Sequence, residues 1–317
     1  MATPATPRVG YIYSPVFLEH ETGDGHPETP ARLTAIHDEI ERSGVLAKLV
    51  RLDPVPATRE QLSLVHDPTM IDRVEALAAQ GGGALDEDTA VSAGSLRAAL
   101  LAAGAGITAV DALYAGVVDR AFLALRPPGH HATGQRSMGF CLFNNVAVAA
   151  AYALARKGAK RVAVVDWDLH HGNGTQDIFY ARADVLYISL HQSPLYPGTG
   201  AARETGEGEG HGTTLNITLP AGASDETFAN KLRSQVMPAL RRYGPDLLIV
   251  SAGFDAHTDD PLGALDVTDD GYRMMTEAIA QVAQELTGGK LLSFLEGGYD
   301  LPALARSARI HVEALLR

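Results

Sequence analysis

Six short apolar runs recur along the chain and limit the folds that are open to it. They are too short for typical helices, and most of them lack the polar alternation of a strand with one face in water. Such runs are typical of strands in a parallel sheet that is covered on both faces. The runs occupy residues 8–14, 121–126, 161–166, 185–191, 246–253 and 291–298.

Alanine-rich stretches separate the apolar runs, and we expect helices there. They span residues 59–80, 94–115, 145–157, 225–243, 269–286 and 302–316. Strands that alternate with helices predict an α/β fold, here an open parallel sheet with helices on both faces and right-handed crossovers. The 317 residues show neither an internal repeat nor a long linker, so we expect a single domain over residues 1–317. We expect the glycine-rich pieces at 80–89 and 198–212 to be long surface loops.

The net charge and the single cysteine argue against several kinds of binding partner and cellular location. A net charge of −12 without any run of Lys or Arg argues against nucleic acid as the main ligand. No apolar run reaches the roughly 20 residues that span a bilayer, and the stretch MATPATPRVG lacks the basic region and apolar core of a signal peptide. Because Cys141 is the sole cysteine, no intramolecular disulfide can form, and we expect a cytoplasmic protein without a membrane partner.

Polar groups of catalytic type follow four of the predicted strands, at the point where each strand ends. The segments are PPGHH after 121–126, DWDLHHGNG after 161–165, FDAH after 246–253 and EGGYD after 291–295. In an open parallel sheet, ligands bind outside the carboxyl ends of the strands. The four segments therefore predict one shared site at this edge of the sheet.

The segment DWDLHH predicts a metal site. Alternation along an extended chain places Asp166, Asp168 and His170 on one side of the strand. Asp255, at the end of another strand, is a further candidate ligand. Carboxylates and an imidazole suit zinc, and three protein ligands leave a coordination position open for water. The alternative is an ion-pair network at the strand ends that holds no metal.

Acid–base groups lie next to these candidate ligands in the predicted sheet. His130 and His131 follow a Pro-Pro-Gly turn, and histidine is the usual proton-transfer group near neutral pH. Asp166 has the chemistry to orient one of the two rings from behind. Tyr299 follows two glycines, and such a turn can bring a phenol toward a developing oxyanion. The alternatives are a histidine pair in a surface loop and an ordinary half-buried tyrosine.

Seven motifs in order now identify a family. They are RPPGHHA, MGFCLFNNVAVAA, DWDLHHGNGTQ, SLH, YPGTG, SAGFDAH and EGGY, preceded by HPETPAR at 26–32. From about residue 10 to residue 300 the sequence resembles the zinc-dependent histone deacetylase superfamily, which includes bacterial histone deacetylase-like amidohydrolases and acetylpolyamine amidohydrolases. The resemblance implies the arginase-deacetylase fold. It also implies hydrolysis of an acylated lysine peptide or a small acylated amine, giving acetate and free amine.

The resemblance also implies roles for single residues. The zinc ligands would be Asp168, His170 and Asp255. His131 would be the general base and then the acid for the leaving amine. His130, hydrogen-bonded to Asp166, would be its electrostatic partner, and Tyr299 would polarise the amide carbonyl opposite the metal.

Substrate-binding and potassium sites follow from the same resemblance. Phe140 and Tyr196 would flank a tunnel for the acyl-lysine side chain, and Gly139 would let the substrate pass close to the backbone. A structural K⁺ would lie near Asp166, Asp168, His170, Ser189 and Leu190, and a second near Phe179 and Val185. Asp88 is a candidate acceptor for hydrogen bonds from a substrate backbone, and the alternative is a solvated acidic loop.

Two positions bear on the branch of the superfamily. Asn173 stands where class I members have Asp, which makes the chain class II-like and predicts a less basic His131. Leu262 stands seven residues after Asp255, where polyamine-specific members can carry a glutamate, so an acylated lysine is favoured over a polyamine. The leading alternative is an acetylpolyamine amidohydrolase. An arginase-like ureohydrolase would need additional metal carboxylates, and a non-catalytic binding module would not need His131 and Tyr299. The sequence does not indicate an oligomeric state.

Overall fold

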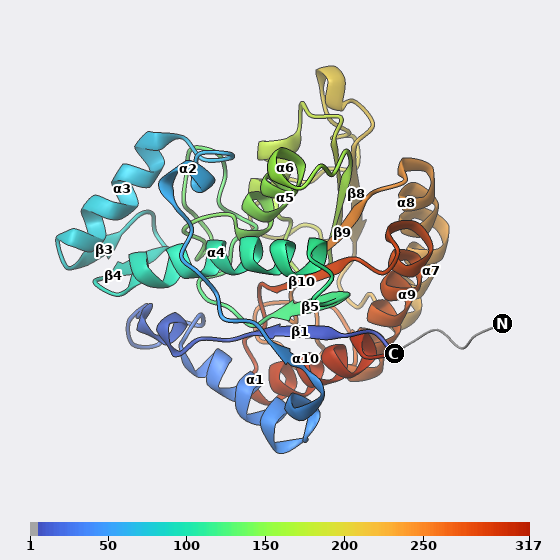
Figure 1. The fold of residues 1–317 in the computed structure, drawn as a ribbon, viewed down its shortest axis with the longest axis horizontal. Coiled ribbons are helices and arrows are strands. Elements are labelled where there is room, and N and C mark those ends of the chain that lie inside the picture. Colours follow the sequence, from blue (N-terminus) through green and yellow to red (C-terminus); the bar gives the residue numbers. More distant parts are fainter. Residues whose placement is uncertain (1–5) are drawn as a thin grey trace.

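The computed structural model describes residues 6–317 and contains an eight-stranded sheet. Every neighbouring pair of strands in this sheet is parallel, as the uninterrupted apolar runs predict (Figure 1). Across the sheet the order is β2 (Val50–Arg51), β1 (Val9–Ile12), β5 (Arg120–Leu123), β10 (Leu291–Leu295), β9 (Leu247–Ala252), β6 (Val162–Asp166), β7 (Val185–Gln192) and β8 (Thr214–Leu219).

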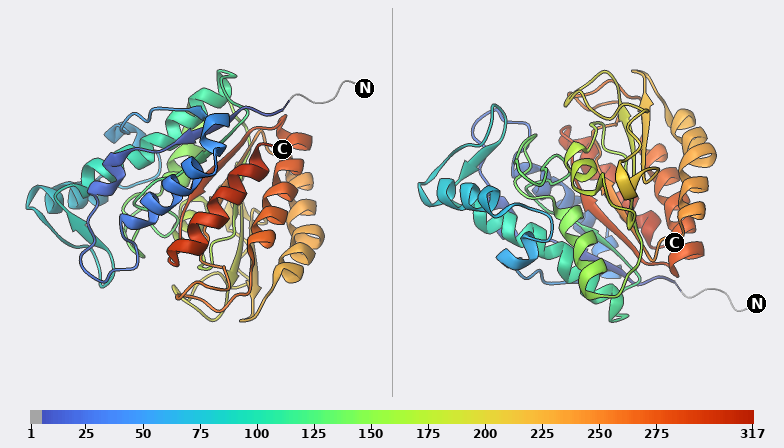
Figure 2. Two further views of the ribbon diagram at one scale, coloured as in Figure 1. Left: turned by 90° about the horizontal axis from the view of Figure 1, so that it is seen from below. Right: turned by 90° about the horizontal axis from the view of Figure 1, so that it is seen from above.

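Helices cover both faces of the sheet, and Figure 2 shows the two layers on either side of it. One layer contains α1 (Ala31–Arg42), α7 (Asp225–Lys231), α8 (Met237–Tyr243), α9 (Asp269–Thr287) and α10 (Leu301–Leu315). The other contains α2 (Arg59–Leu62), α4 (Ser95–Tyr114), α5 (Asn145–Arg156) and α6 (Asn173–Phe179). The α/β fold with an open parallel sheet and helices on both faces is therefore confirmed.

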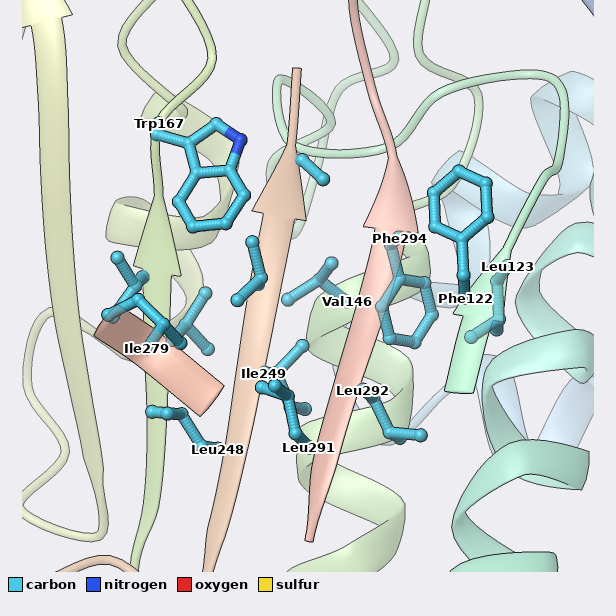
Figure 3. Packing of buried hydrophobic residues seen from close by; sticks show 14 of the residues in the cluster. Phe122, Leu123, Val146, Trp167, Leu248, Ile249, Ile279, Leu291, Leu292 and Phe294 are labelled. Carbon is cyan, nitrogen blue, oxygen red and sulfur yellow. The ribbon is translucent and has the colours of Figure 1, made fainter. Parts of the chain in front are cut away.

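The main core lies between the sheet and these helical layers. Figure 3 shows Val146 of α5 and Ile279 of α9 packed near strand residues such as Ile249 and Phe294. These four side chains are completely buried, and full burial of one such side chain stabilises a fold by about 1.5–3 kcal/mol. A smaller core cluster joins α3 (Pro68–Ala79) to α4 and α5.

The expected helix over 59–80 is wrong, because the chain breaks between α2 and α3. Pro68 has no N–H and disfavours the helical conformation at the residue before it, so Pro68 begins a new helix. Asp67 caps that helix, with its Oδ1 accepting a hydrogen bond from the Thr69 N–H at 2.8 Å. The expected helix over 225–243 is likewise divided, by a π-helical turn at Leu232–Val236.

Several elements were missing from the sequence expectations. The glycine-rich piece 80–89 forms part of a two-stranded antiparallel hairpin, β3 (Gly82–Ala84) and β4 (Ala90–Ser92), at one end of the molecule (Figure 1). Helices α1 and α6 and strands β2 and β8 were also not anticipated. Strand β10 ends at Leu295, so that 296–298 leaves the sheet as irregular chain.

Helix α4 is long and apolar enough to cross a membrane by length and composition, contrary to the expectation that no run qualifies. Within residues 6–317 it is the one helix that passes this test. Of its apolar window, 72% is buried inside the molecule, where the helix packs on α5 and β10. Burial in the core accounts for its apolar composition.

Candidate active site

Four polar segments meet at the carboxyl edge of the sheet because the strands that precede them are neighbours. Strands β5, β10, β9 and β6 lie side by side in that order. Each ends within a few residues of one segment: PPGHH, EGGYD, FDAH and DWDLHH. The structure therefore brings together side chains that lie up to about 170 residues apart in the sequence, as with His130 and Tyr299.

Asp168, His170 and Asp255 form a cluster of possible metal ligands. One ligand atom from each residue lies within 4.8 Å of the others, and no other such group of three or more was found in residues 6–317. His170 Nδ1 is 3.2 Å from Asp168 Oδ1 and 3.1 Å from Asp255 Oδ2. The extended strand ends at Asp166, so bends in 168–170, rather than strict alternation, complete this arrangement.

Backbone donors fix both carboxylates. The Gly297 N–H donates to Asp168 Oδ2 at 2.8 Å, and the Leu169 N–H donates to Asp255 Oδ1 at 2.9 Å. Gly297 is required at its position, because a Cβ there would collide with the carboxylate oxygens of Asp255 and Asp168. The turn after β10 thus lies directly against the candidate metal ligands.

The electrostatics of the cluster favour a bound cation. Burial raises the pKa of Asp255 to about 7, and the charge of Asp168 adds to this effect. Burial opposes protonation of His170, but hydrogen bonds to Asp168 and Asp255 outweigh it and raise the pKa of His170 to about 10. Two buried carboxylates and one imidazole thus attract a positive charge, and this donor set fits zinc.

His130 and His131 lie beside the cluster with their ring centroids 4.0 Å apart. His130 Nδ1 is 3.1 Å from Asp166 Oδ2, which also accepts the Tyr187 hydroxyl at 3.0 Å. Burial disfavours the charged form of His130, yet the carboxylates of Asp168, Asp166 and Glu296 hold its pKa well above the usual value. Burial lowers the pKa of His131 well below its usual value, and the neighbouring His130 charge adds to this.

Asn173 determines which nitrogen of His131 is free. The Asn173 amide nitrogen donates to the backbone oxygen of His131 at 3.4 Å, so its carbonyl oxygen faces the ring. That oxygen lies 2.8 Å from His131 Nδ1 and accepts the proton there. The arrangement leaves His131 Nε2 as a proton acceptor.

Aromatic side chains surround the approach to these groups. The Tyr196 ring centroid lies 5.2 Å from that of His131, and the Tyr299 centroid lies 6.1 Å from that of Phe140. Tyr196 is 39% exposed, so it stands at the surface end of this group. Gly139 has a φ of 57°, and a Cβ there would collide with the His131 ring, so glycine is needed for this close approach.

Tyr299 is held by groups from other segments. Its N–H donates to Asp260 Oδ2 at 2.7 Å, and the Arg32 guanidinium lies 4.9 Å from its ring centroid. Burial raises the pKa of the phenol well above its usual value, although the Arg32 charge opposes this. The phenol is therefore a hydrogen-bond donor at neutral pH.

The two remaining candidates, Asp88 and Leu262, lie outside the helices and strands. Asp88, in the β3–β4 hairpin, accepts the Thr89 hydroxyl at 2.9 Å, and Thr89 Oγ1 in turn accepts the Phe140 N–H at 3.1 Å. Leu262 is tied to Asp260 Oδ1 through its N–H at 3.0 Å. Asp88 is thus connected to Phe140, and Leu262 to the segment that carries Tyr299.

Sequence reasoning missed a set of buried charged residues behind the site. Glu28 is completely buried between Arg32, at 2.9 Å, and Arg126, whose Nη2 lies 2.6 Å away. Arg32 also donates to the backbone oxygens of Gly298 and Glu296, both at 2.6 Å, and so supports the turn before Tyr299. Glu296 and Asp260 were also missed. The only signal for Glu296 was a carboxylate placed directly after a buried apolar run.

Comparison with known proteins relates the whole chain to one family. The model of the histone deacetylase domain matches residues 26–315. An uncharacterised protein of Synechocystis sp. is 43% identical, covering 97% of this chain and 99% of its own. The histone deacetylase-like amidohydrolase of Pseudomonas aeruginosa is also 43% identical, covering 87% of this chain and 73% of its own. The crystal structure of the HDA15 HD domain superposes with a TM-score of 0.92 at 40% identity, covering 98% of this chain and 89% of that one.

These matches, over most of the chain, are to a family of deacetylases, and the fold agrees with them. The chain belongs to the histone deacetylase family. The family resemblance and the deacetylase fold expected from the motifs are thereby confirmed.

Proposed function

We propose that this chain is a zinc-dependent amidohydrolase that removes acetyl or other short acyl groups from acylated lysine or related amines. The observation that carries the proposal is the buried cluster of Asp168, His170 and Asp255 beside His131. Membership of a deacetylase family supports hydrolysis of an acylated amine. Residues 1–317 would form one catalytic domain, located in the cytoplasm.

The metal would be held by Asp168, His170 and Asp255, whose atoms suit zinc. Zinc bound there would lower the pKa of a water molecule and polarise the substrate carbonyl. A structural K⁺ would bind near Asp166, Asp168, His170, Ser189 and Leu190, and a second near Phe179 and Val185. These residues lie in or next to β6, α6 and β7.

His131 would transfer the proton. Its Nε2, left free by the Asn173 hydrogen bond at Nδ1, would take a proton from the attacking water as the water oxygen bonds to the acyl carbon. The same nitrogen would return the proton to the amine nitrogen as the C–N bond breaks. His130, held by Asp166, would supply a positive charge beside the reacting groups.

The remaining residues would bind the acyl group and its chain. The Tyr299 hydroxyl would donate a hydrogen bond to the carbonyl oxygen as negative charge develops there. Phe140 and Tyr196 would flank an extended aliphatic chain, with Gly139 leaving room near the His131 ring. Asp88 would accept a hydrogen bond from a substrate N–H, and Leu262 would present an apolar group at the mouth.

A substrate panel tests the proposal. The zinc-loaded chain is assayed on acetyl-lysine peptides, longer acyl-lysine peptides and acetylputrescine, with release of the acid and the amine both measured. We expect hydrolysis of acyl-lysine and a weaker reaction with the polyamine. A preference of more than about tenfold for acetylputrescine would instead support the acetylpolyamine amidohydrolase alternative, since each tenfold is 1.4 kcal/mol in the transition state. No hydrolysis of any acylated amine would reject the proposed function.

A further inference from the structure

Glu296 has an unusual position for a carboxylate that follows a buried strand. It is 1% exposed and lies at the carboxyl end of β10, outside the cluster of candidate metal ligands. Its Oε2 accepts the Gly129 N–H at 2.8 Å and the His130 N–H at 3.2 Å. Its Oε1 accepts the Ser251 hydroxyl at 3.1 Å. One carboxylate therefore joins β10 and β9 to the backbone of the histidine pair.

The first two backbone N–H groups of the segment that carries the histidines both point to Glu296, whereas its carbonyl groups bond elsewhere. The His130 backbone oxygen accepts the Gly174 and Thr175 N–H groups at 3.0 and 3.1 Å. Pro127 and Pro128 have no N–H, so Gly129 and His130 supply the first two backbone donors after Arg126. Both donate to Glu296, and neither belongs to a strand. A buried N–H without an acceptor costs about 1–3 kcal/mol, so the Glu296 carboxylate stabilises the conformation in which both N–H groups reach it.

The alternative role of Glu296 is electrostatic. Its charge favours the protonated form of His130, and burial raises the pKa of Glu296 itself to about 7. A carboxylate needed only for its charge would not have to contact two consecutive N–H groups. The observed geometry is instead that of an anchor, which is a side chain that holds the backbone in place. The Glu296 side chain is long enough to reach both N–H groups, and its Oε2 accepts a hydrogen bond from each.

We propose that Glu296 is a positioning residue of the histidine pair, in addition to Asp166 and Asn173: by accepting the Gly129 and His130 N–H groups it helps to place the His131 ring for proton transfer. The expected effect of Glu296 on the reaction rate rests on the proposed function. His131 follows His130 directly and bonds to Asn173 of another segment, so a shift of the His130 backbone changes where His131 Nε2 points. A misplacement of about 1 Å can cost on the order of 10²-fold in rate.

Two substitutions distinguish the effect of the length of the Glu296 side chain from the effect of its charge. Glu296→Gln keeps the length and one side-chain oxygen for the two N–H groups, while its amide can donate to the Ser251 hydroxyl. Glu296→Asp keeps the charge but withdraws the carboxylate by one methylene. Ser293→Ala is the control, since Ser293 lies in the same strand and its buried hydrogen bond goes to His311, away from the site.

We expect Glu296→Gln to keep kcat within about threefold of the wild-type zinc enzyme and Glu296→Asp to lower kcat at least tenfold, with KM and zinc content unchanged in both. Ser293→Ala should lower stability without changing kcat.

Amide hydrogen exchange of Gly129 and His130, measured by NMR, should accelerate at least tenfold in Glu296→Asp and stay slow in Glu296→Gln. This readout does not require activity, so it also tests the anchor if the wild type hydrolyses no acylated amine. Equal or higher kcat in Glu296→Asp than in Glu296→Gln, or unchanged exchange in Glu296→Asp, would overturn the proposal.

Discussion

At the scale of single residues, Tyr299 shows how neighbours from other segments set the properties of one side chain. Its backbone is bonded to Asp260 and its ring lies under Arg32, both of which belong to other parts of the chain. Burial raises the pKa of the Tyr299 phenol and keeps it protonated. Its hydroxyl, on the residue that follows two glycines, can therefore donate a hydrogen bond. Such a donor is most useful where negative charge develops during a reaction.

Tyr299→Phe removes the phenolic donor and little else. We expect kcat on acetyl-lysine peptide to fall about 10²-fold or more, the usual cost of losing one oxyanion donor, while KM changes little. The aromatic ring remains beside Arg32 and Phe140, so the thermal midpoint should stay within a few degrees. Steady-state kinetics and a thermal melt check this, and an unchanged kcat would remove Tyr299 from the proposed chemistry.

At the scale of elements, His311 shows how α10 is attached to the rest of the fold. Its Nδ1 lies 2.7 Å from Thr276 Oγ1 of α9, and its Nε2 lies 2.7 Å from Ser293 Oγ of β10. The Thr276 hydroxyl donates to the Tyr272 backbone oxygen, so it accepts the proton of Nδ1. The neutral ring therefore joins three elements, and burial lowers the pKa of His311 to about 3.

The depressed pKa of His311 makes its contribution to stability depend on pH. The unfolded chain binds a proton near pH 6.5 and the folded chain does not, so this stability is present above pH 6.5 and is lost as the pH falls toward 3. Between pH 8 and pH 5 the loss is about 2 kcal/mol. The difference in unfolding free energy between wild type and His311→Gln should shrink by that amount, as measured by urea unfolding of both proteins at the two pH values. A constant difference would contradict the expectation.

Asp260 attaches the loop after β9 to the turn after β10. Its Oδ1 accepts the Leu262 N–H and its Oδ2 accepts the Tyr299 N–H. In Asp260→Asn one of these N–H groups would face the amide NH₂, so we expect kcat to fall roughly tenfold, with zinc content unchanged. Asp259→Asn is the matched control, because Asp259 is 55% exposed and bonds outward to Arg306. Equal kcat values for the two variants would exclude this role of Asp260.

A structural feature of this molecule can be predicted from the sequence when residues close together along the chain determine it. The central strands, and the polar segments that follow them, were predicted because apolar runs and strand ends are local patterns. The break at Pro68 had a local signal, the proline itself, which the expectation of one helix over 59–80 left out of account. The edge strand Val50–Arg51 is two residues long, which is too short to show an alternation of apolar and polar residues. Glu296 and Asp260 accept N–H groups from distant segments, and only the three-dimensional structure reveals those pairings.

At the scale of the whole molecule, most of the hydrophobic core lies beyond the candidate metal site. The large cluster extends across the sheet from Val9 of β1 to Leu219 of β8, and only a few of its members, such as Trp167, Leu169 and Phe254, directly adjoin Asp168, His170 and Asp255 in the sequence. The fold should therefore form without metal, and the metal should add stability by binding the folded chain alone. Metal-dependent stability and metal-dependent activity can then be measured on the same folded protein.

Removal of zinc is expected to abolish hydrolysis while leaving the helix and sheet content intact by circular dichroism. Zinc at about 1,000 times its Kd stabilises the folded state by about 4 kcal/mol, which raises the thermal midpoint by roughly 5–10 °C.

The effect of zinc on the thermal midpoint should depend on pH. Because the pKa of His170 is near 10 in the metal-free chain, zinc must displace a proton from this ring. The zinc-dependent shift of the midpoint should therefore become smaller as the pH falls from 8 to 6. Asp255→Asn should lose the shift, because it removes one ligand charge from the cluster. A midpoint independent of zinc, together with full activity after chelation, would show that the Asp168–His170–Asp255 cluster is an ion-pair network and not a metal site.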